Sequence, residues 1–253
     1  MNETISNSPH QWNTQELPVV VIAGYGPSIG ESTARQFGSK GYAIACLGRT
    51  QNKLLDSVQE LKASKITAAA FVTDCGDTRS VKEAIQQVQS HLGRISVIVW
   101  NAASYVGSDL VTGNDDPSEI LNQIVGVGCA GLLASIQEAY EDLKAMKGTI
   151  LITGGGLSGY DQNVNQIAVN NSWMGLAFCK SSQRKLAGLL HARLKPDGVM
   201  VGTVIISGAV RVGGGLDVTD PDDVATAFWE IHHSRHKQEV HLGSLTQLAS
   251  EPT

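Results

Sequence analysis

The feature that most constrains the fold is a set of short segments that are apolar on both faces. A strand with one solvated face alternates apolar and polar residues, whereas a parallel strand covered by helices on both sides is apolar throughout. The segments of this second kind are Pro18–Ala23, Tyr42–Leu47, Ile66–Thr73, Ile95–Trp100, Thr149–Thr153 and Val199–Ile206. They predict six parallel strands, and Glu239–Leu242 is a weaker candidate for a seventh.

Longer amphipathic stretches separate these segments and predict helices. The predicted helices are Ile29–Lys40, Asn52–Ser64, Ser80–Leu92, Pro117–Met146, Ser172–Leu194 and Val224–His232. Asp116-Pro117 and Asp220-Pro221 each set a capping carboxylate before a proline at the first helical position. The alternation predicts an α/β fold, a single Rossmann-type doubly wound parallel sheet of six to seven strands with helices on both faces.

Length and charge narrow the class of protein. The 253 residues show no repeat, low-complexity tract or linker, which predicts one domain over residues 18–253 after a disordered N-terminal extension over residues 1–17. The formal net charge of −5 disfavours a nucleic-acid partner. No run approaches the roughly eighteen apolar residues of a membrane span, so no membrane partner is expected.

The cysteines indicate a compartment. The chain has four, Cys46, Cys75, Cys129 and Cys179, and no CxxC pair. Scattered cysteines in apolar stretches are typical of free thiols in a reducing environment. The first residues lack the basic start and apolar core of a signal peptide. The sequence therefore predicts a cytoplasmic protein.

A glycine-rich loop lies between the first predicted strand and the first predicted helix. It reads Gly24-Tyr25-Gly26-Pro27-Ser28-Ile29-Gly30. At such a junction, glycines permit a tight turn and let a pyrophosphate approach the free N–H groups of the helix. The loop predicts dinucleotide binding through Gly24, Gly26, Ser28, Ile29 and Gly30, and the alternative is a tight turn without a ligand.

Residues after the second and third predicted strands indicate which dinucleotide binds. NAD usually pairs with an acid at the end of the second strand, where this chain has Gly48 followed by Arg49. A guanidinium pairs well with a 2′-phosphate, so NADP(H) is favoured over NAD(H); the alternative is a surface arginine. Asp74, after the third strand, offers a carboxylate to the adenine amino group or caps the following helix.

Together these features resemble the short-chain dehydrogenase/reductase family, from Pro18 to about Leu242. Gly24, Ser28 and Gly30 fall on its TGxxxGxG motif, with Ser28 in place of the middle glycine. Asn101-Ala102-Ala103 falls on NNAG, which the resemblance places at the cofactor. The resemblance also implies a homodimer or homotetramer, assembled through Pro117–Met146 and Ser172–Leu194.

The resemblance places Lys180 on the lysine of YxxxK, as a binder of the nicotinamide ribose and a catalytic residue. Four residues earlier, where the family has its proton-donating tyrosine, the chain has Leu176. The family serine falls in Thr153-Gly154-Gly155-Gly156, and the family asparagine falls on Gly128. The sequence thus predicts a divergent member that lacks this tyrosine, serine and asparagine.

Another proton donor is therefore sought. Tyr160 lies in a polar segment between Thr153 and Lys180 and is a candidate catalytic residue; the alternative is a solvated loop with asparagines in its turns. Ser104 and Tyr105 also flank the expected pocket. Trp173 is expected in an apolar substrate wall or a subunit contact.

Three histidines near one helix end predict no metal site. His232, His233 and His236 lie where a helix C-terminus favours histidine, and no fourth ligand is evident. We expect a solvated helix end. The short span Gly208–Asp220 predicts an open pocket, a bulky substrate, or closure by a neighbouring subunit.

Three functions stay open at this point. The first is an NADP(H)-dependent oxidoreductase acting on a carbonyl, an alcohol or a related small molecule with a rearranged proton donor. The second is an enzyme of the same fold that performs a cyclisation or isomerisation without net redox chemistry. The third is a non-catalytic regulator that binds NADP(H). Fold alone does not distinguish them.

Overall fold

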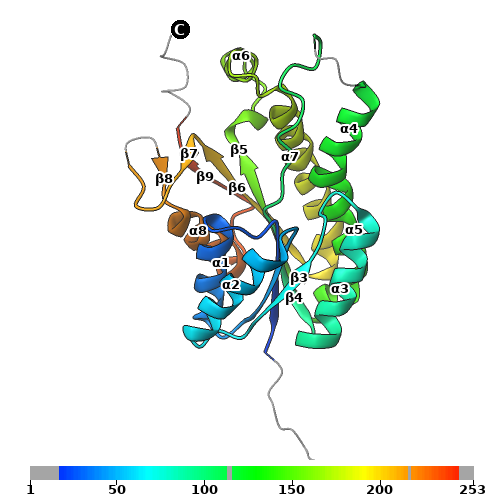
Figure 1. The fold of residues 1–253 in the computed structure, drawn as a ribbon, viewed down its shortest axis with the longest axis vertical. Helices are drawn as coiled ribbons and strands as arrows, with labels where there is room; N and C mark the ends of the chain where they lie inside the picture. Colours follow the sequence, from blue (N-terminus) through cyan, green and yellow to red (C-terminus); the bar gives the residue numbers. More distant parts are fainter. Residues whose placement is uncertain (1–16, 113–115, 216–217, 245–253) are drawn as a thin grey trace, which may run out of the picture.

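The predicted parallel sheet is present in the structure (Figure 1), a computed structural model that describes residues 17–112, 116–215 and 218–244. Its strands are β1 Val19–Ala23, β2 Ala43–Gly48, β3 Ala68–Val72, β4 Ile95–Trp100, β5 Thr149–Gly155, β6 Met200–Ser207 and β9 Glu239–Gly243. All pair in parallel in the order β3-β2-β1-β4-β5-β6-β9. The seven predicted strands are therefore confirmed. Residues 1–16 of the predicted extension lie outside the described residues.

Helices cover both faces of the sheet, as Figure 1 shows. One layer holds α1 Ile29–Gly38, α2 Gln51–Ala63 and α8 Pro221–Ser234. The other layer holds α3 Thr78–Leu92, α5 Gly131–Ala145 and α7 Met174–Leu194. The doubly wound α/β fold is thereby confirmed, because helices of both layers pack on the same sheet.

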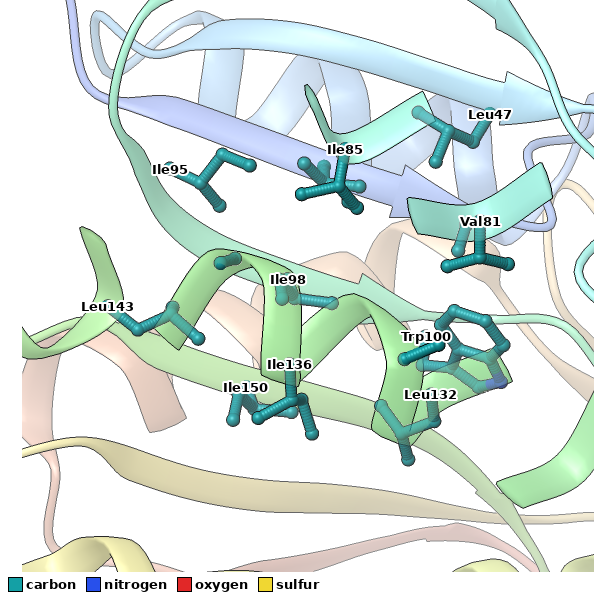
Figure 2. Close-up of a cluster of buried hydrophobic side chains, with 14 of the residues drawn as sticks. Leu47, Val81, Ile85, Ile95, Ile98, Trp100, Leu132, Ile136, Leu143 and Ile150 are labelled. Atoms are coloured by element: carbon teal, nitrogen blue, oxygen red, sulfur yellow. The ribbon is translucent and has the colours of Figure 1, made fainter. Parts of the chain in front are cut away.

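Two apolar cores lie between the sheet and its helical layers. Figure 2 shows the core under α3 and α5, where Val81 and Ile85 meet side chains of β4 and Leu132 lies beside Trp100. The second core joins Phe37 of α1 and Phe228 of α8 to the opposite face of the sheet. A strand buried in both cores needs apolar residues at every position, which explains the unbroken apolar segments of the sequence.

Carboxylates fix the starts of several helices. The Asp116 side chain accepts hydrogen bonds from the backbone of Ser118 and Glu119 at the start of α4 Pro117–Val125. Asp220 caps α8 in the same way. Both predicted starts are confirmed. The residue that caps α3 is Asp77, so the capping alternative for Asp74 is wrong.

The helix predicted over Pro117–Met146 contains a π-turn, η1 Gly126–Ala130, between α4 and α5. A π-turn leaves backbone carbonyls without their usual partners. The indole Nε1 of Trp100 donates to the carbonyl of Val127 at 3.0 Å and satisfies one of them. Gly131 follows directly, and a Cβ there would lie 2.9 Å from the Trp100 ring. Small residues and one tryptophan thus hold this helix close to β4.

The same helical span, Pro117–Ala145, has the length and composition of a membrane helix. Its 29 residues include an 18-residue window of mean hydropathy 1.5, of which 44% is buried inside the protein. The prediction that no stretch of this kind exists is wrong at the level of composition. Leu132, Ile136 and Leu143 of this span pack in the core shown in Figure 2. We therefore assign the span to the core of the domain.

Three short elements were missed by the sequence reasoning. The polar segment interpreted as a solvated loop contains α6 Gln162–Asn170, which Asp161 caps by accepting from the backbone of Val164. Val164, Ile167 and Ala168 of α6 are buried. Two-residue strands β7 Ala209–Val210 and β8 Val218–Thr219 form a separate parallel pair. In Figure 1, α6, β7 and β8 lie at the end of the sheet toward which β5 and β6 point.

The expectation of a solvated end for His232 is wrong. Its ring packs with Phe37, Tyr42 and Trp229. Its two ring nitrogens lie 2.8 Å from the Tyr42 hydroxyl and 2.8 Å from the Thr149 hydroxyl. Burial lowers the pKa of His232 to about 4. In the part of the chain that the structure describes, no three His, Cys, Asp or Glu side chains are grouped to hold a metal ion.

Candidate active site

The carboxyl ends of the strands open into a cleft made of two connected cavities. The larger one, of about 1320 Å³, extends over β1, β2, β3 and β4. The smaller one, of about 610 Å³, extends over β5, β6 and the start of α7. Gly26, Pro27, Asn101 and Tyr105 line both cavities. The two cavities therefore meet between β1 and β4, where the strand order reverses and such sheets bind ligands.

The glycine loop forms the boundary between the two cavities. Gly24 has φ +76°, and a Cβ there would lie 2.6 Å from the backbone nitrogen of Ala102. At Gly26 a Cβ would meet nothing within 4 Å, so the backbone of the loop faces open space. Ser28 precedes α1 and makes no capping bond with its side chain. Bare backbone before a helix N-terminus is the arrangement that binds phosphate groups.

Charged side chains line the larger cavity beyond the loop. Arg49 follows β2 directly, is exposed and lines this cavity, together with Lys53 one turn further along α2. Sequence reasoning missed Lys53, although its spacing of four residues from Arg49 was a usable signal. Asp74 lines the same cavity, and its carboxylate accepts from the backbone of Gly76 at 2.9 Å. Asp56 and Asp77 line this cavity as well, so a ligand that extends from the loop meets two cations and three carboxylates.

Hydrogen bonds join three strands at the centre of the cleft. The Asn101 amide donates to the carbonyl of Gly24 at 2.9 Å. Its oxygen accepts from the Thr153 hydroxyl at 2.8 Å. The carbonyl of Thr153 in turn accepts from Lys180 Nζ at 2.7 Å. The three predicted residues Gly24, Asn101 and Lys180 therefore belong to one network.

Lys180 is buried, with 7% of its surface exposed, and it lines the smaller cavity. Its ammonium also donates to Gln183 Oε1 at 3.1 Å. Gln183 is fully buried, and its amide donates to the carbonyl of Ala102 at 3.0 Å. Burial among neutral partners lowers the pKa of Lys180 to about 8. Sequence reasoning missed Gln183, although it lies three residues after Lys180 on the same helix.

Three residues near Lys180, at or within the segments that the resemblance assigns to acid–base residues, carry no polar side chain. Leu176 lies in the wall of the smaller cavity, one turn before Lys180. At Gly155 a Cβ would lie 3.1 Å from Lys180 Cγ, so this is the position of β5 that faces the lysine. At Gly128, in the π-turn, a Cβ would lie 2.9 Å from Cys179 Sγ. The space for an asparagine side chain there is taken by Cys179.

The candidate tyrosines lie in different places. Tyr160 is 89% exposed, lies just before α6 and lines neither cavity. Tyr105 is 78% exposed and lines both cavities. Ser104 is buried and lines the larger cavity. Trp173 lines the smaller cavity, as expected for a substrate wall. Tyr105, and not Tyr160, therefore lines the same cavity as Lys180.

Solved structures share this fold at low sequence identity. An alcohol dehydrogenase from the archaeon Thermococcus sibiricus, complexed with 5-hydroxy-NADP, superposes with a TM-score of 0.76 at 21% identity over 94% of this chain and 100% of that one. A short chain oxidoreductase from Pseudomonas aeruginosa PAO1, described as containing an atypical catalytic center, gives 0.75 at 17% identity over 93% and 98% of the two chains. These similarities show the fold.

Curated proteins match parts of the chain. Meso-2,3-butanediol dehydrogenase of Serratia marcescens is 35% identical over 144 residues, which are 56% of this chain and 55% of that enzyme. For another relative, human Short-chain dehydrogenase/reductase 3, the match is 32% identical over 98 residues and covers 38% of this chain and 32% of the relative. The chain thus spans between a third and just over half of the length of these two relatives.

The family follows from a match that covers most of the chain. The family model described as short chain dehydrogenase matches residues 18–205, from the first strand through most of β6. This segment includes the glycine loop, Arg49, Asp74, Asn101 and Lys180. With the strand order and the position of the cleft, the match shows that the chain belongs to the short chain dehydrogenase family.

Proposed function

We propose that this protein is an NADP(H)-dependent oxidoreductase that acts on a carbonyl compound or the corresponding alcohol. The observation that carries the proposal is the continuity of the cleft. One end is lined by the cations Arg49 and Lys53, and the other end has Lys180 in an apolar cavity. A dinucleotide is long and charged at one end, and it matches such a cleft in shape and charge. The Thermococcus sibiricus relative in fold was solved with 5-hydroxy-NADP, which supports this choice.

The residues of the cleft suit the parts of NADP(H). The bare backbone at Gly26 leaves room for the pyrophosphate, and Gly24 lets the loop pass close to the backbone of Ala102. Arg49 is suited to the 2′-phosphate and Asp74 to the adenine amino group. Lys180 has two of its three ammonium protons in hydrogen bonds, which leaves one for the ribose. When bound, the cofactor supplies or accepts a hydride.

The proton donor is the part of the mechanism that departs from the family pattern. Leu176 has no proton to give, and Gly155 and Gly128 have no side chain. Among the tyrosines considered, Tyr105 reaches the cleft from the loop after β4, while Tyr160 lies outside it. We therefore favour Tyr105 over Tyr160 as the group that exchanges a proton with the substrate oxygen. Tyr105 would donate this proton from the place where the two cavities meet.

Cofactor titration and a turnover assay together test this proposal. NADPH is titrated into the protein by calorimetry, and a panel of ketones and aldehydes is then screened for loss of nicotinamide absorbance. We expect NADPH binding and slow turnover, with turnover lost in Tyr105→Phe and retained in Tyr160→Phe. The absence of NADPH binding would overturn the proposal. Retained turnover in Tyr105→Phe would overturn the role of Tyr105 alone.

A second candidate is an enzyme that keeps the cofactor site and performs a cyclisation or isomerisation without net redox change. It is favoured because Leu176, Gly155 and Gly128 have no polar side chain, whereas the cleft proposed for the cofactor is lined throughout. A non-catalytic NADP(H) sensor has the same support. NADPH binding with no oxidation across the panel, in the parent and in both tyrosine variants, favours these two readings over the first.

We also propose a cytoplasmic homodimer or homotetramer. The four cysteines are free, and three of them, Cys46, Cys75 and Cys179, are buried. Burial raises the pKa of Cys75 to about 11, which keeps its thiol protonated and unreactive. Free thiols of this kind suit a reducing compartment.

A further inference from the structure

We propose that the smaller cavity accepts an uncharged, largely apolar carbonyl compound, or the matching secondary alcohol, and rejects polyols and carboxylates. This inference rests on the proposed function, because it names the substrate class of that site. It follows from three properties of the cavity: its apolar wall, its already engaged polar groups and its charge.

The wall is apolar on two sides. Leu157, Trp173 and Leu176 line one side, and Ile206 and Val210 line the other. The first side is held by a small core of its own, in which Leu157 packs with α6 and with Trp173 and Leu176. A wall that is packed from behind keeps its shape when a ligand arrives. Burial of an apolar ring against it is favourable in proportion to the apolar area removed from water.

Asn101 and Thr153, two polar side chains that line the cavity, are already paired within the protein. Asn101 uses both its amide group and its oxygen, toward Gly24 and Thr153. The Thr153 hydroxyl donates to Asn101. A polyol entering this cavity would lose its hydrogen bonds to water, and these two side chains offer it few replacements, which makes its burial unfavourable. The exposed Tyr105 hydroxyl is suited to a single oxygen at the mouth of the cavity.

Charge also excludes anionic substrates. Lys180 is the single charged side chain among the described residues that line this cavity. Two of its protons are given to Thr153 and Gln183, and the third is assigned above to the cofactor ribose. A substrate carboxylate would therefore be buried without a partner, which is strongly unfavourable. The ligand compatible with this cavity therefore has an apolar body and one neutral oxygen.

Ligand binding tests the inference without depending on turnover. 2-Decalone and 1-tetralone, as apolar ketones, and dihydroxyacetone and 2-ketogluconate, as polyol and carboxylate probes, are titrated calorimetrically into the protein with and without NADP⁺. We expect binding of the two apolar ketones at least tenfold tighter than of the other probes. Equal or tighter binding of dihydroxyacetone or 2-ketogluconate overturns the inference.

Two pairs of variants locate the binding. Val210→Asn places an amide in the cavity wall, whereas Val212→Asn makes the same change two residues away at a side chain that is 75% exposed and does not line the cavity. Leu176→Asn and the exposed Val169→Asn form a second pair. We expect weaker 2-decalone binding, by roughly tenfold, in Val210→Asn and Leu176→Asn only. Unchanged binding in both wall variants overturns the inference.

The same titrations separate this inference from the proposed function. NADP⁺ binding together with failure of 2-decalone to bind contradicts the inference alone. Failure of NADP⁺ to bind contradicts the proposed function, and the cofactor-free titration still shows whether the cavity selects apolar ketones.

Discussion

Arg49 is the residue that we propose to distinguish the two nicotinamide cofactors by its charge. Arg49 follows β2 directly and lines the larger cavity. The strand ends in Gly48 and not in the acid that usually pairs with NAD. We expect Arg49→Ala to remove one charge-assisted interaction worth about 1.5–3 kcal/mol, or roughly ten- to hundredfold in NADPH affinity. NADH affinity should change little, because NADH has no 2′-phosphate. Calorimetric titration with both cofactors measures the difference.

The matched control is Arg79→Ala, an exposed arginine at the start of α3 that does not line either cavity. It should bind both cofactors as the parent does. An equal loss for NADPH and NADH in Arg49→Ala would contradict the assignment of Arg49 to the phosphate.

Lys180 gives the site a pH dependence. Burial lowers the pKa of Lys180 to about 8, and its protonated form is the donor that we propose for the ribose. NADPH affinity should therefore be full below pH 8 and decline as the pH rises through about 8, because the ammonium loses its charge there. Fluorescence titration of NADPH between pH 6 and pH 10, roughly the range that brackets this pKa, measures the decline.

Two variants isolate the effect of that ammonium. Lys180→Met should bind NADPH roughly ten- to hundredfold more weakly and show no decline near pH 8. Lys185→Met, an exposed lysine on the same helix, should keep the decline of the parent. A decline that persists in Lys180→Met rules out Lys180 as its source.

Residues that act through motifs could be predicted from the sequence, and residues that act through packing could not. Gly24, Arg49 and Lys180 follow known spacings, and the structure places all three in the cleft. The position of Tyr105 at the junction of both cavities depends on the path of a loop. The role of Gln183 depends on a carbonyl of Ala102, 81 residues away in the chain. Neither relation is present in local sequence.

At the scale of the element, we predict opposite effects on stability for alanine substitutions at two helical glycines. A Cβ at Gly131, the first residue of α5, would meet the carbonyl oxygen of Cys75 and the Trp100 ring, whereas at Gly188, inside α7, it would meet nothing within 4 Å. Gly131→Ala should lower the free energy of unfolding by about 1–3 kcal/mol through overpacking. Gly188→Ala should raise it by roughly 0.5–1 kcal/mol through helix propensity. Urea denaturation measures both, and a gain in Gly131→Ala would contradict the packing described.

His232 makes the attachment of α8 to the sheet sensitive to acid. Its pKa is lowered to about 4 in the folded protein from an ordinary value near 6.5. Between these values the unfolded chain binds a proton that the folded protein does not, so stability is full above about pH 6.5 and falls as the pH drops toward 4. The melting temperature measured between these pH values should decline with acidity.

Substitutions of adjacent histidines separate the source of this decline. His232→Phe removes the proton-binding ring from the cluster of Phe37, Tyr42 and Trp229, so its decline should be shallower. His233→Phe changes the exposed neighbour that stacks on Trp229 and should leave the slope unchanged. Identical slopes in both variants would place the acid sensitivity elsewhere.

Elements with regular apolar patterns were predicted, and elements held by tertiary contacts were not. The strands and the long helices have strong periodic signals. The π-turn Gly126–Ala130 depends on Trp100 as a partner for a released carbonyl, and α6 depends on a small core with Leu157 and Trp173. The asparagines around α6 favour turns by local propensity, and burial of Val164 and Ile167 outweighs that preference.

At the scale of the whole molecule, we expect the chain to assemble into a homodimer or homotetramer. Exposed apolar side chains lie on the helices expected at the interface, among them Leu121 on α4 and Leu189 on α7. Light scattering at micromolar concentration should give a mass of at least two chains of 26.8 kDa. Leu189→Glu should reduce the mass, because it sets a charge in the interface, while Leu55→Glu on α2 of the opposite layer should not. A monomeric parent would refute the assembly.

The strand order has a consequence for synthesis of the chain. The first strand of the sheet in chain order, β1, lies inside the sheet; β2 and β3 extend it on one side, and β4, β5, β6 and β9 then extend it on the other. Each new strand therefore pairs with one that has already been made, and β4 does so by returning to β1 rather than pairing with β3. During translation the sheet can therefore grow outward from β1 strand by strand, and few strands need a partner that has not yet been made. The half that carries Arg49 and Asp74 is complete before the half that carries Lys180 has been translated.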